Sequence, residues 1–415
     1  MKICVIGLGY IGLPTASMFA SHGNTVIGVD KNPAVIEALN QGNIIIEEKH
    51  LDGLVKEVVA ADHLKGYTEP EVADAFIISV PTPITEEKKA DLSYVEAATE
   101  SIVPYLRPGC IVVLESTSPV GTVEQLMAPI LRKSGLEPGD DFYLGHSPER
   151  VIPGKILYEL VHNSRIAGGI NPASSEKIAE LYSCFVEGEI YQSDARTAEL
   201  CKLTENTFRD INIAFANELA QICENLHMDV WEVIHLCNMH PRVNIHQPGP
   251  GVGGHCIAVD PWFIVEKQPQ TAKLIHQARL INDFMPEYVA SHIEQWLAGV
   301  KNPVVTVLGV TYKPDVDDMR ESPVLKLIDM LKAKGIQVAI HDPFVKQYQG
   351  SITAAAAGSD MLVLGVHHSE YQNLPVEQLY SVMRGRLFYD TRNFCDAKAF
   401  EKAGFTVRRL GVVKD

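Results

Sequence analysis

A cysteine and an aspartate stand four residues apart at the end of a glycine-rich stretch. The stretch reads PGPGVGGHCIAVDP, in which flexible backbone presents Cys256, and Asp260 follows one turn later if a helix begins there. A thiolate can add to an aldehyde, and the hemithioacetal can give up a hydride to form a thioester, which water hydrolyses to an acid. The pattern therefore favours Cys256 as a nucleophile over a small buried hydrophobe, which we expect the other seven cysteines to be.

Three histidines close to this cysteine raise the alternative of a metal centre. His240, His246 and His255 match no zinc-binding spacing, and the surrounding proline and glycine would not fix a tetrahedron. We therefore expect no metal.

A lysine and an asparagine share one face of the helix predicted near 196–226. Lys202 and Asn206 lie four residues apart, and Arg209 follows one turn further. A lysine near a reacting oxygen can stabilise an alkoxide, and an asparagine can orient it. A solvated helix face is the alternative, and the helix pattern alone favours it.

A second motif with chemical content lies at the start of the chain. GLGYIG places Gly7, Gly9 and Gly12 between a predicted strand and helix, where small residues let the backbone approach a pyrophosphate. Asp30 closes the next strand, where a carboxylate can accept ribose hydroxyls and would repel the extra phosphate of NADP. The motif predicts NAD as cofactor; the alternative is a structural turn with Asp30 as a helix cap.

Two further strand ends carry small hydroxyl residues. VPTP at 80–83 and ESTSPVGT at 115–122 make Thr82 and Thr117 candidate cofactor contacts. Helix capping would explain either threonine equally well.

The elements that must position these residues alternate between short β-branched runs and helical patterns. This alternation covers residues 1–193 and resumes after 299, and long apolar-periodic helices fill the interval. The pattern predicts an α/β protein with two doubly wound Rossmann-like domains joined by a central helical domain. The predicted domains are 1–193, which binds NAD, 194–298, which carries the cysteine loop, and 299–415.

Bulk composition narrows the class of protein. A formal net charge of −16 argues against nucleic acid as a partner, and no run approaches the roughly 20 apolar residues of a membrane span. The eight cysteines form no CxxC pair, so free thiols in a reducing cytoplasm are the expectation. We read the amino terminus, MKICVIGLGYIGLP, as a first strand and turn and not as a signal peptide.

The combination GLGYIG, VPTP, ESTSPVGT, HSPER, KLTENTFRDINIAFANEL, GPGVGGHCIAVDPWF, YKPDVDDMRESP and YDTRN resembles the UDP-glucose and UDP-N-acetylmannosamine dehydrogenase family over nearly the whole chain. The cysteine loop is most similar to that of the UDP-N-acetylmannosamine 6-dehydrogenases. The resemblance implies a four-electron oxidation of a UDP-sugar at C6 with two NAD+ per sugar, feeding surface polysaccharide synthesis.

The resemblance also implies roles for individual residues. Cys256 would be the nucleophile and Lys202 the oxyanion-stabilising group, while Asp260, Glu149 and Thr117 would position or activate water. The implied cofactor contacts are Tyr10, Ile11, Asp30, Thr82, Thr117 and Arg320. The implied substrate contacts are Arg150, Val151, Lys202, Asn206, Arg209, His240, Arg242, Gly253, Lys313 and Arg392.

This chain departs from the family in one motif, and the family has a characteristic mode of assembly. UDP-glucose enzymes usually read Pro-Glu-x-x-x-Glu-Gly, whereas this chain reads PERVIPG, so Pro153 replaces the second acid. Family members form homodimers or larger homo-oligomers through the long central helix, with an arginine at the Arg242 position reaching the neighbour.

Three alternatives stay open at this point. A 3-hydroxyacid dehydrogenase would need no thiol and no second nucleotide domain. A sensor of NAD or nucleotide sugars would bind without turnover. A UDP-N-acetylglucosamine or UDP-glucose 6-dehydrogenase would differ only in a few pocket contacts, worth about 1 to 3 kcal/mol. For Arg320, Lys313 and Arg392, a surface salt bridge is the alternative to ligand binding.

Overall fold

The computed structural model describes residues 1–46, 48–152 and 154–413, which group by their contacts into two compact units. The first unit contains Met1–Glu205 and Trp262–Gln268, and the second contains Asn206–Pro261 and Pro269–Asp415. The boundary therefore falls within a long helix, α8 (Ala195–Asn225), and again within α10 (Asp260–Lys267). Pro153, which replaces the second acid of the family motif, lies outside the described residues.

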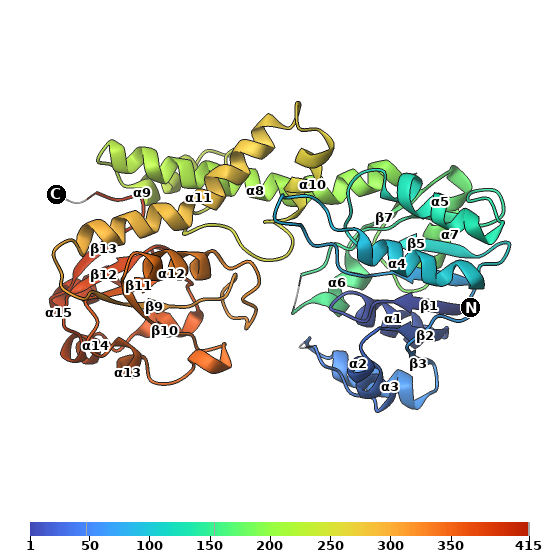
Figure 1. Ribbon diagram of the computed structural model, residues 1–415, viewed down its shortest axis with the longest axis horizontal. Helices are drawn as coiled ribbons and strands as arrows, with labels where there is room; N and C mark the ends of the chain where they lie inside the picture. Colours follow the sequence, from blue (N-terminus) through green and yellow to red (C-terminus); the bar gives the residue numbers. More distant parts are fainter. Residues whose placement is uncertain (47, 153, 414–415) are drawn as a thin grey trace. The chain divides into compact units, whose positions relative to one another are not determined.

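The first unit is built around one sheet covered by helices (Figure 1). Its elements are β1 (Lys2–Ile6), α1 (Gly12–Ser21), β2 (Thr25–Val29), α2 (Pro33–Asn40), α3 (Leu51–Ala60), β3 (Leu64–Tyr67), β4 (Ala75–Ile78), α4 (Ser93–Ile102), β5 (Ile111–Leu114), α5 (Ala128–Leu131), β6 (Tyr143–His146), α6 (Ile156–His162), β7 (Arg165–Gly169), α7 (Pro172–Tyr182) and β8 (Ile190–Asp194).

The strands of this sheet follow the order β3-β2-β1-β4-β5-β6-β7-β8. The chain order reverses between β1 and β4, so their carboxyl ends flank the crevice where doubly wound sheets bind ligands. The predicted doubly wound fold is confirmed. One strand pair of this sheet is not parallel: β7 runs antiparallel to β6, pairing Gly169 with Gly145. The strand RIAGG has too short an apolar run to be found from hydrophobic pattern.

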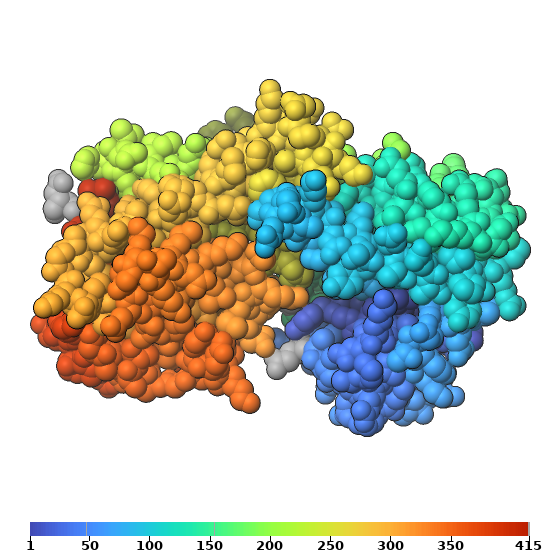
Figure 2. Space-filling view, viewed as in Figure 1, coloured from blue at the N-terminus to red at the C-terminus, as the bar shows by residue number. Residues whose placement is uncertain are grey.

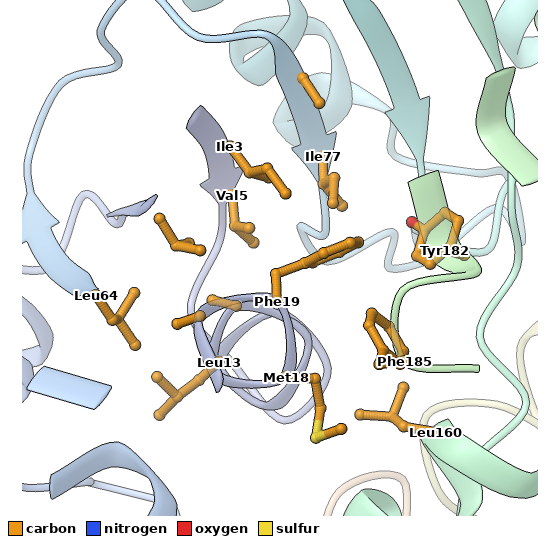
Figure 3. Packing of buried hydrophobic residues seen from close by; sticks show 14 of the residues in the cluster. Ile3, Val5, Leu13, Met18, Phe19, Leu64, Ile77, Leu160, Tyr182 and Phe185 are labelled. Atoms are coloured by element: carbon orange, nitrogen blue, oxygen red, sulfur yellow. The ribbon is translucent and has the colours of Figure 1, made fainter. Parts of the chain in front are cut away.

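Helix α1 fixes the glycine turn because almost all of it is buried against the sheet. Ile3 and Val5 of β1 are fully buried beside it, and Phe19 projects from the helix towards two aromatic rings (Figure 3). The ring centroid of Phe19 lies 5.5 Å from that of Tyr182 and 4.9 Å from that of Phe185. This packing sets the position of the helix amino end relative to β1.

The second unit combines long helices with a five-stranded parallel sheet. Besides the second part of α8, its elements are α9 (Val230–Cys237), α11 (Lys273–Trp296), β9 (Val304–Leu308), α12 (Pro323–Ala333), β10 (Gln337–His341), α13 (Ile352–Ala356), β11 (Met361–Leu364), α14 (Val376–Val382), β12 (Leu387–Asp390), α15 (Ala397–Ala403) and β13 (Thr406–Arg409). The strand order is β10-β9-β11-β12-β13. Helix α11 packs against α12, and their yellow-orange and orange side chains adjoin in the space-filling view (Figure 2).

In both sheets, an aspartate side chain accepts a hydrogen bond from the turn after the first strand. In the first unit, the N–H of Leu8 donates to Asp30 Oδ2 at 3.0 Å. In the second unit, the N–H of Val310 donates to Asp342 Oδ2 at 2.7 Å. Asp30 follows β2 and holds the turn after β1, and Asp342 follows β10 and holds the turn after β9. The similarity of pattern seen in the sequence therefore extends to equivalent hydrogen bonds.

Exposure of the cysteines departs from the expectation for four of the seven, of which Cys201 and Cys395 are partly exposed. Cys4, Cys110 and Cys223 are buried, as expected of small hydrophobes. Cys184, in the turn after α7, and Cys237, the last residue of α9, are exposed, so that expectation was wrong for them. Both lie at helix ends, where an apolar sequence neighbourhood does not guarantee burial. Separately, the described ranges contain no helix long and apolar enough to cross a membrane.

Candidate active site

The turn after β1 admits only glycine at two positions. Gly7 has a φ of +91°, and a Cβ there would overlap the carbonyl oxygen of Ser79; a Cβ on Gly12 would overlap the carbonyl oxygen of Gly7. Gly9, in contrast, has nothing within 4 Å of where its Cβ would be. The turn is thus packed tightly on the protein side and open at Gly9, where a pyrophosphate can approach the backbone. These residues fit a dinucleotide.

Asp30 supports the turn without capping the next helix. Its Oδ2 accepts from Leu8, as described above, and its Oδ1 accepts the N–H of Asn32 at 2.9 Å. The cap of α2 is Asn32, whose side-chain oxygen accepts the N–H of Ala34 at 3.1 Å. The capping role therefore belongs to Asn32, and the partly exposed Asp30 carboxylate keeps lone pairs for ribose hydroxyls.

The loops after β4 and β5 are tied together at the same edge of the sheet. The hydroxyl of Thr82 donates to the carbonyl oxygen of Thr117 at 2.6 Å, and the N–H of Val80 donates to Ser116 Oγ at 2.8 Å. The helical segments that follow begin at Ser93 and Val123, so neither threonine caps them. The structure brings the two threonines together, and their contact with the cofactor stays a prediction.

The motif HSPER begins at the last residue of β6 and places two charged residues in ion pairs. Glu149 is 9% exposed and pairs with Arg165. Arg150 donates from Nε to Glu205 at 3.1 Å and also pairs with the other oxygen of that carboxylate. Arg150, predicted to contact the sugar, is therefore held by a carboxylate of α8. Its role towards substrate stays a prediction.

A buried histidine at the end of β6 lies within the electrostatic reach of Lys202. His146 is fully buried, and neither ring nitrogen has a hydrogen-bond partner among the described residues. Burial lowers the pKa of His146 to about 3, and the positive charge of Lys202 acts in the same direction. The imidazole is therefore neutral. Sequence reasoning did not single out this histidine, because a lone histidine at a strand end carries no motif.

Steric fit within the second unit shapes the cysteine loop. Gly254 has a φ of +83°, a Cβ there would lie 2.8 Å from the Tyr312 ring, and its N–H donates to the carbonyl oxygen of Arg320 at 3.1 Å. The carbonyl oxygen of Cys256 accepts the N–H of Asp260 at 2.8 Å. This is a helical hydrogen bond, so α10 begins one turn after the partly exposed Cys256, as the spacing predicted.

Asn206 and Asp260 meet in a buried hydrogen bond. The side-chain amide of Asn206 donates to Asp260 Oδ2 at 2.5 Å, and the two residues are 8% and 2% exposed. The bond joins α8 to the start of α10 and so fixes the segment that leaves Cys256. The solvated-face alternative is therefore wrong for Asn206. Arg209, which shares the predicted face, is exposed.

A buried polar network supports the proline- and glycine-rich segment before the cysteine. Asn217 accepts the N–H of Gly249 at 2.9 Å and donates to Asn282 at 2.9 Å. Asn282 donates to Asp210 Oδ1 at 2.8 Å, and Arg279 donates to the same oxygen at 2.5 Å. Burial raises the pKa of Asp210, while Arg279 opposes the rise. Sequence reasoning missed all four side chains, because polar residues on a helix usually indicate a solvated face.

A partly buried arginine lies at the carboxyl edge of the second sheet. Arg392 donates from Nε to the carbonyl oxygen of Gly365 at 3.4 Å, and a Cβ on Gly249 would overlap its guanidinium. Burial lowers the pKa of Arg392 to about 10, and the described residues give it no ion pair. His367 has an unpartnered Nδ1 in the described chain, and burial lowers its pKa to about 4. An unpaired guanidinium at this edge suits an anionic ligand.

The remaining predicted residues lie at or near the surface. Arg320 forms a two-pronged pair with Asp318, at 2.6 Å for its closest contact, so a surface salt bridge describes it in this structure. Lys313 follows β9 and is partly exposed. Tyr10, Ile11, Val151 and Gly253 are partly exposed, whereas His240 and Arg242 are exposed. Within the described ranges, no group of three or more His, Cys, Asp or Glu could hold a metal ion.

The first unit has a glycine turn with its acidic residue, and the second has an arginine at the carboxyl edge of its sheet to which the described residues give no ion pair. Together these features define a dinucleotide-dependent dehydrogenase with an additional nucleotide-binding domain. Family models extend this conclusion. The chain belongs to the UDP-glucose/GDP-mannose dehydrogenase family: the NAD binding domain matches residues 1–186, the central domain 196–284 and the UDP binding domain 306–397. It is an NAD-dependent enzyme, and the third domain excludes the 3-hydroxyacid dehydrogenase alternative.

Individual relatives are similar over almost the full length. A UDP-N-acetyl-D-mannosamine dehydrogenase of Methanococcus maripaludis is 46% identical over 99% of this chain and 97% of its own. An NDP-N-acetyl-D-galactosaminuronic acid dehydrogenase of Ralstonia nicotianae is 47% identical over 95% and 96%. The solved structure of a UDP-D-ManNAc dehydrogenase from Pyrococcus horikoshii is 40% identical over 99% of both chains, with a TM-score of 0.94.

Proposed function

We propose that this enzyme oxidises UDP-N-acetyl-D-mannosamine at C6 to the uronate, with a thioester on Cys256. The observation that supports the chemistry most directly is the arrangement around Cys256: a glycine-shaped loop presents it, and α10 begins one turn later with Asp260 bound to Asn206. The choice of sugar rests on relatives and solved structures named for UDP-N-acetylmannosamine.

The reaction balances as one alcohol, two NAD+ and one water giving one carboxylate, two NADH and three protons. NAD+, when bound, supplies the hydride acceptor for both oxidations. In our proposal Lys202 stabilises the alkoxide of the first step, and the Cys256 thiolate then adds to the aldehyde carbon. After the second hydride leaves, a water adds to the thioester carbonyl and the carbon–sulfur bond breaks, returning Cys256 as the thiolate.

We assign the hydrolytic water to Glu149, with Thr117 and Asp260 as positioning groups. Glu149 follows β6 at the carboxyl edge of the first sheet, where ligands of doubly wound folds bind. The second acid of the UDP-glucose motif is replaced by Pro153, so Glu149 is the acid that PERVIPG retains.

Substrate binding in this proposal draws on the residues implied by the family resemblance. Arg392 has the strongest support, because it is partly buried and the described residues give its guanidinium no ion pair. Lys313 would act beside it on the diphosphate, and Arg150 would have to exchange its pair with Glu205 for the sugar. Arg209, Val151, Gly253, His240 and Arg242 remain proposed contacts, as do Tyr10, Ile11 and Arg320 on the cofactor side.

Three functional domains, 1–193, 194–298 and 299–415, fit this division of roles. The central one is our candidate for homodimerisation. Phe208, Phe215 and Ile222 recur every seven residues along α8 and are 64%, 47% and 45% exposed. A heptad stripe of exposed apolar side chains on a long helix is typical of a helix that packs against a second copy.

The first test is the yield of NADH from limiting UDP-N-acetylmannosamine, with UDP-N-acetylglucosamine and UDP-glucose run beside it. Two NADH per sugar from the manno compound alone support the proposal. One NADH per sugar contradicts the thioester route, and turnover with another sugar moves the assignment to that substrate. A galacto-configured substrate belongs in the panel because the Ralstonia relative is named for a galactosaminuronic acid.

Cys256→Ser tests the nucleophile. A hydroxyl is a far weaker nucleophile at neutral pH, so acid formation should be lost while NAD binding, measured by calorimetry, stays intact. Normal acid formation by this variant would end the thioester proposal.

A further inference from the structure

A buried cluster of charged side chains lies behind Glu149 in the first unit. Glu149 Oε2 pairs with Arg165, and its Oε1 accepts the N–H of Arg150 at 2.7 Å. Both oxygens of the carboxylate are therefore engaged, which restricts the side chain to one orientation. Arg165 is 4% exposed, so water does not compete strongly for its guanidinium.

Arg165 is itself held by a second carboxylate. Its Nη1 donates to Glu115 Oε1 at 3.3 Å and to Ser147 Oγ at 3.1 Å. Its guanidinium carbon lies 4.0 Å from the ring centroid of Tyr182, in a cation–π contact. These contacts fix the plane of the Arg165 guanidinium, so the nitrogen that pairs with Glu149 keeps its position.

Glu115 connects this cluster to the helix that follows the glycine turn. It comes directly after β5, is 2% exposed, and accepts the hydroxyl of Tyr182 at 2.7 Å. Its other oxygen accepts the hydroxyl of Thr15, on α1, at 3.3 Å. Burial raises the pKa of Glu115 to about 7. The residue after Glu115 is Ser116, which holds the loop after β4 through Val80.

An ion pair with only a structural role would not need two carboxylates around one arginine. One carboxylate would neutralise Arg165, and replacing buried ion pairs by apolar side chains is often neutral or stabilising. Here two carboxylates share one guanidinium in a buried place at the carboxyl ends of β5 and β6. Retaining the second acid costs desolvation energy, and Glu115 contacts Nη1 of Arg165 while Glu149 contacts Nη2 of the same guanidinium.

We propose that Arg165 and Glu115 are positioning residues that hold the Glu149 carboxylate in the orientation required to take a proton from the hydrolytic water. This inference rests on the proposed role of Glu149. In that step one water proton passes to Glu149, the hydroxyl joins the acyl carbon, and Cys256 leaves as thiolate. Glu149 then releases its proton to solvent.

The test is a stopped-flow measurement of NADH with saturating NAD+ and UDP-N-acetylmannosamine. Both hydrides leave before hydrolysis, so an enzyme slow only in hydrolysis should release two NADH per active site rapidly and then turn over slowly. Arg165→Lys keeps the charge but loses the fork, and a misplaced carboxylate should lower kcat by up to about 100-fold with this burst. Glu115→Gln keeps the shape and should give the same pattern in weaker form.

Two further variants are measured in the same assay: Glu149→Gln, which removes the proposed base, and Glu199→Gln, which is a control. Glu199 is a matched control, because it is 1% exposed in the same unit and accepts backbone N–H groups of Gly121 and Val123 but does not contact Arg165. Its variant should show no burst. The KM for NAD+ should be unchanged in Arg165→Lys, which a general loss of structure in the unit would not allow.

The outcomes separate this inference from the proposed function. A burst in Glu149→Gln but not in Arg165→Lys or Glu115→Gln overturns the positioning role alone. Normal kcat in Glu149→Gln contradicts the water role assigned to Glu149, and with it this inference. A wild-type yield other than two NADH per sugar contradicts the proposed function itself. Equal slowing of first and later turnovers in Arg165→Lys would also overturn the inference. If that variant does not fold, the Glu115→Gln result decides.

Discussion

The NAD preference of the first unit depends on one carboxylate, and changing Asp30 to Asn tests it. The carboxylate accepts the N–H groups of Leu8 and Asn32 at 3.0 and 2.9 Å, so its position is fixed before the cofactor binds. A hydrogen bond from a ribose hydroxyl to a charged acceptor contributes about 1.5 to 3 kcal/mol, which corresponds to about 10- to 150-fold in Kd. Asp30→Asn should weaken NAD binding by an amount in this range.

The structure offers a matched control in Asp342→Asn. Asp342 makes the equivalent hydrogen bond to Val310 in the second sheet, and it is fully buried against His368. Because it holds a different domain, its substitution should change the Kd for NAD by no more than about twofold. Isothermal titration calorimetry of both variants with NAD and NADP gives the comparison.

A second readout follows from charge. Asp30→Asn removes the repulsion of the extra phosphate, so NADP affinity should fall less than NAD affinity or rise. Unchanged NAD affinity in Asp30→Asn, or an equal loss in Asp342→Asn, would refute the reasoning. The first result would make Asp30 a support of the turn alone, and the second would mean that either change acts by destabilising the whole protein.

Three further predictions concern the loop, the buried network and pH. Gly254→Ala should lower the free energy of unfolding by about 1 to 2 kcal/mol, because Gly254 has a φ of +83°. It should also lower kcat while NAD affinity stays unchanged. An unaffected kcat would mean that catalysis does not need this loop geometry. Arg279→Leu should cost about 3 to 5 kcal/mol in urea unfolding, since Asp210 loses its charge partner, and a loss below about 1 kcal/mol would contradict this. Burial raises the pKa of Glu199 to about 7, so the folded state binds a proton that the unfolded state has released. The free energy of unfolding should therefore fall by about 3 kcal/mol as pH rises from about 4.5 to 7. Glu199→Gln should reduce this dependence of stability on pH, and an unchanged dependence would assign the effect to other groups.

Much of the fold could be predicted from sequence because its signals are local. Strand, glycine turn, helix and acid follow one another within the first 30 residues, and steric exclusion of any Cβ at Gly7 and Gly12 explains why glycine stands there. The spacing of Cys256 and Asp260 predicted one helical turn, and the hydrogen bond between their backbones confirms it. Patterns with a period of 2 or 3.6 residues likewise carry enough information to place most strands and helices.

Other features had no signal in the sequence. The strand β7, RIAGG, is short and rich in glycine, and its antiparallel pairing with β6 depends on a partner far along the chain. The exposure of Cys184 and Cys237 depends on what packs nearby, which their apolar neighbours in sequence do not reveal. Hydrophobic pattern therefore predicts elements better than it predicts their partners.

The sequence alone indicated the type of chemistry and the cofactor turn, because each depends on residues that are adjacent or one helical turn apart. The alternation of strand and helix patterns along the chain indicated the order of the domains. Only the tertiary structure decided which polar side chains are buried and paired. Arg165 meets Glu115 across 50 positions of the chain, and Asn206 meets Asp260 across 54. The electrostatic environment of Glu149 and the support of the cysteine loop arise from such pairs, since burial and charge partners are properties of packing and not of local sequence.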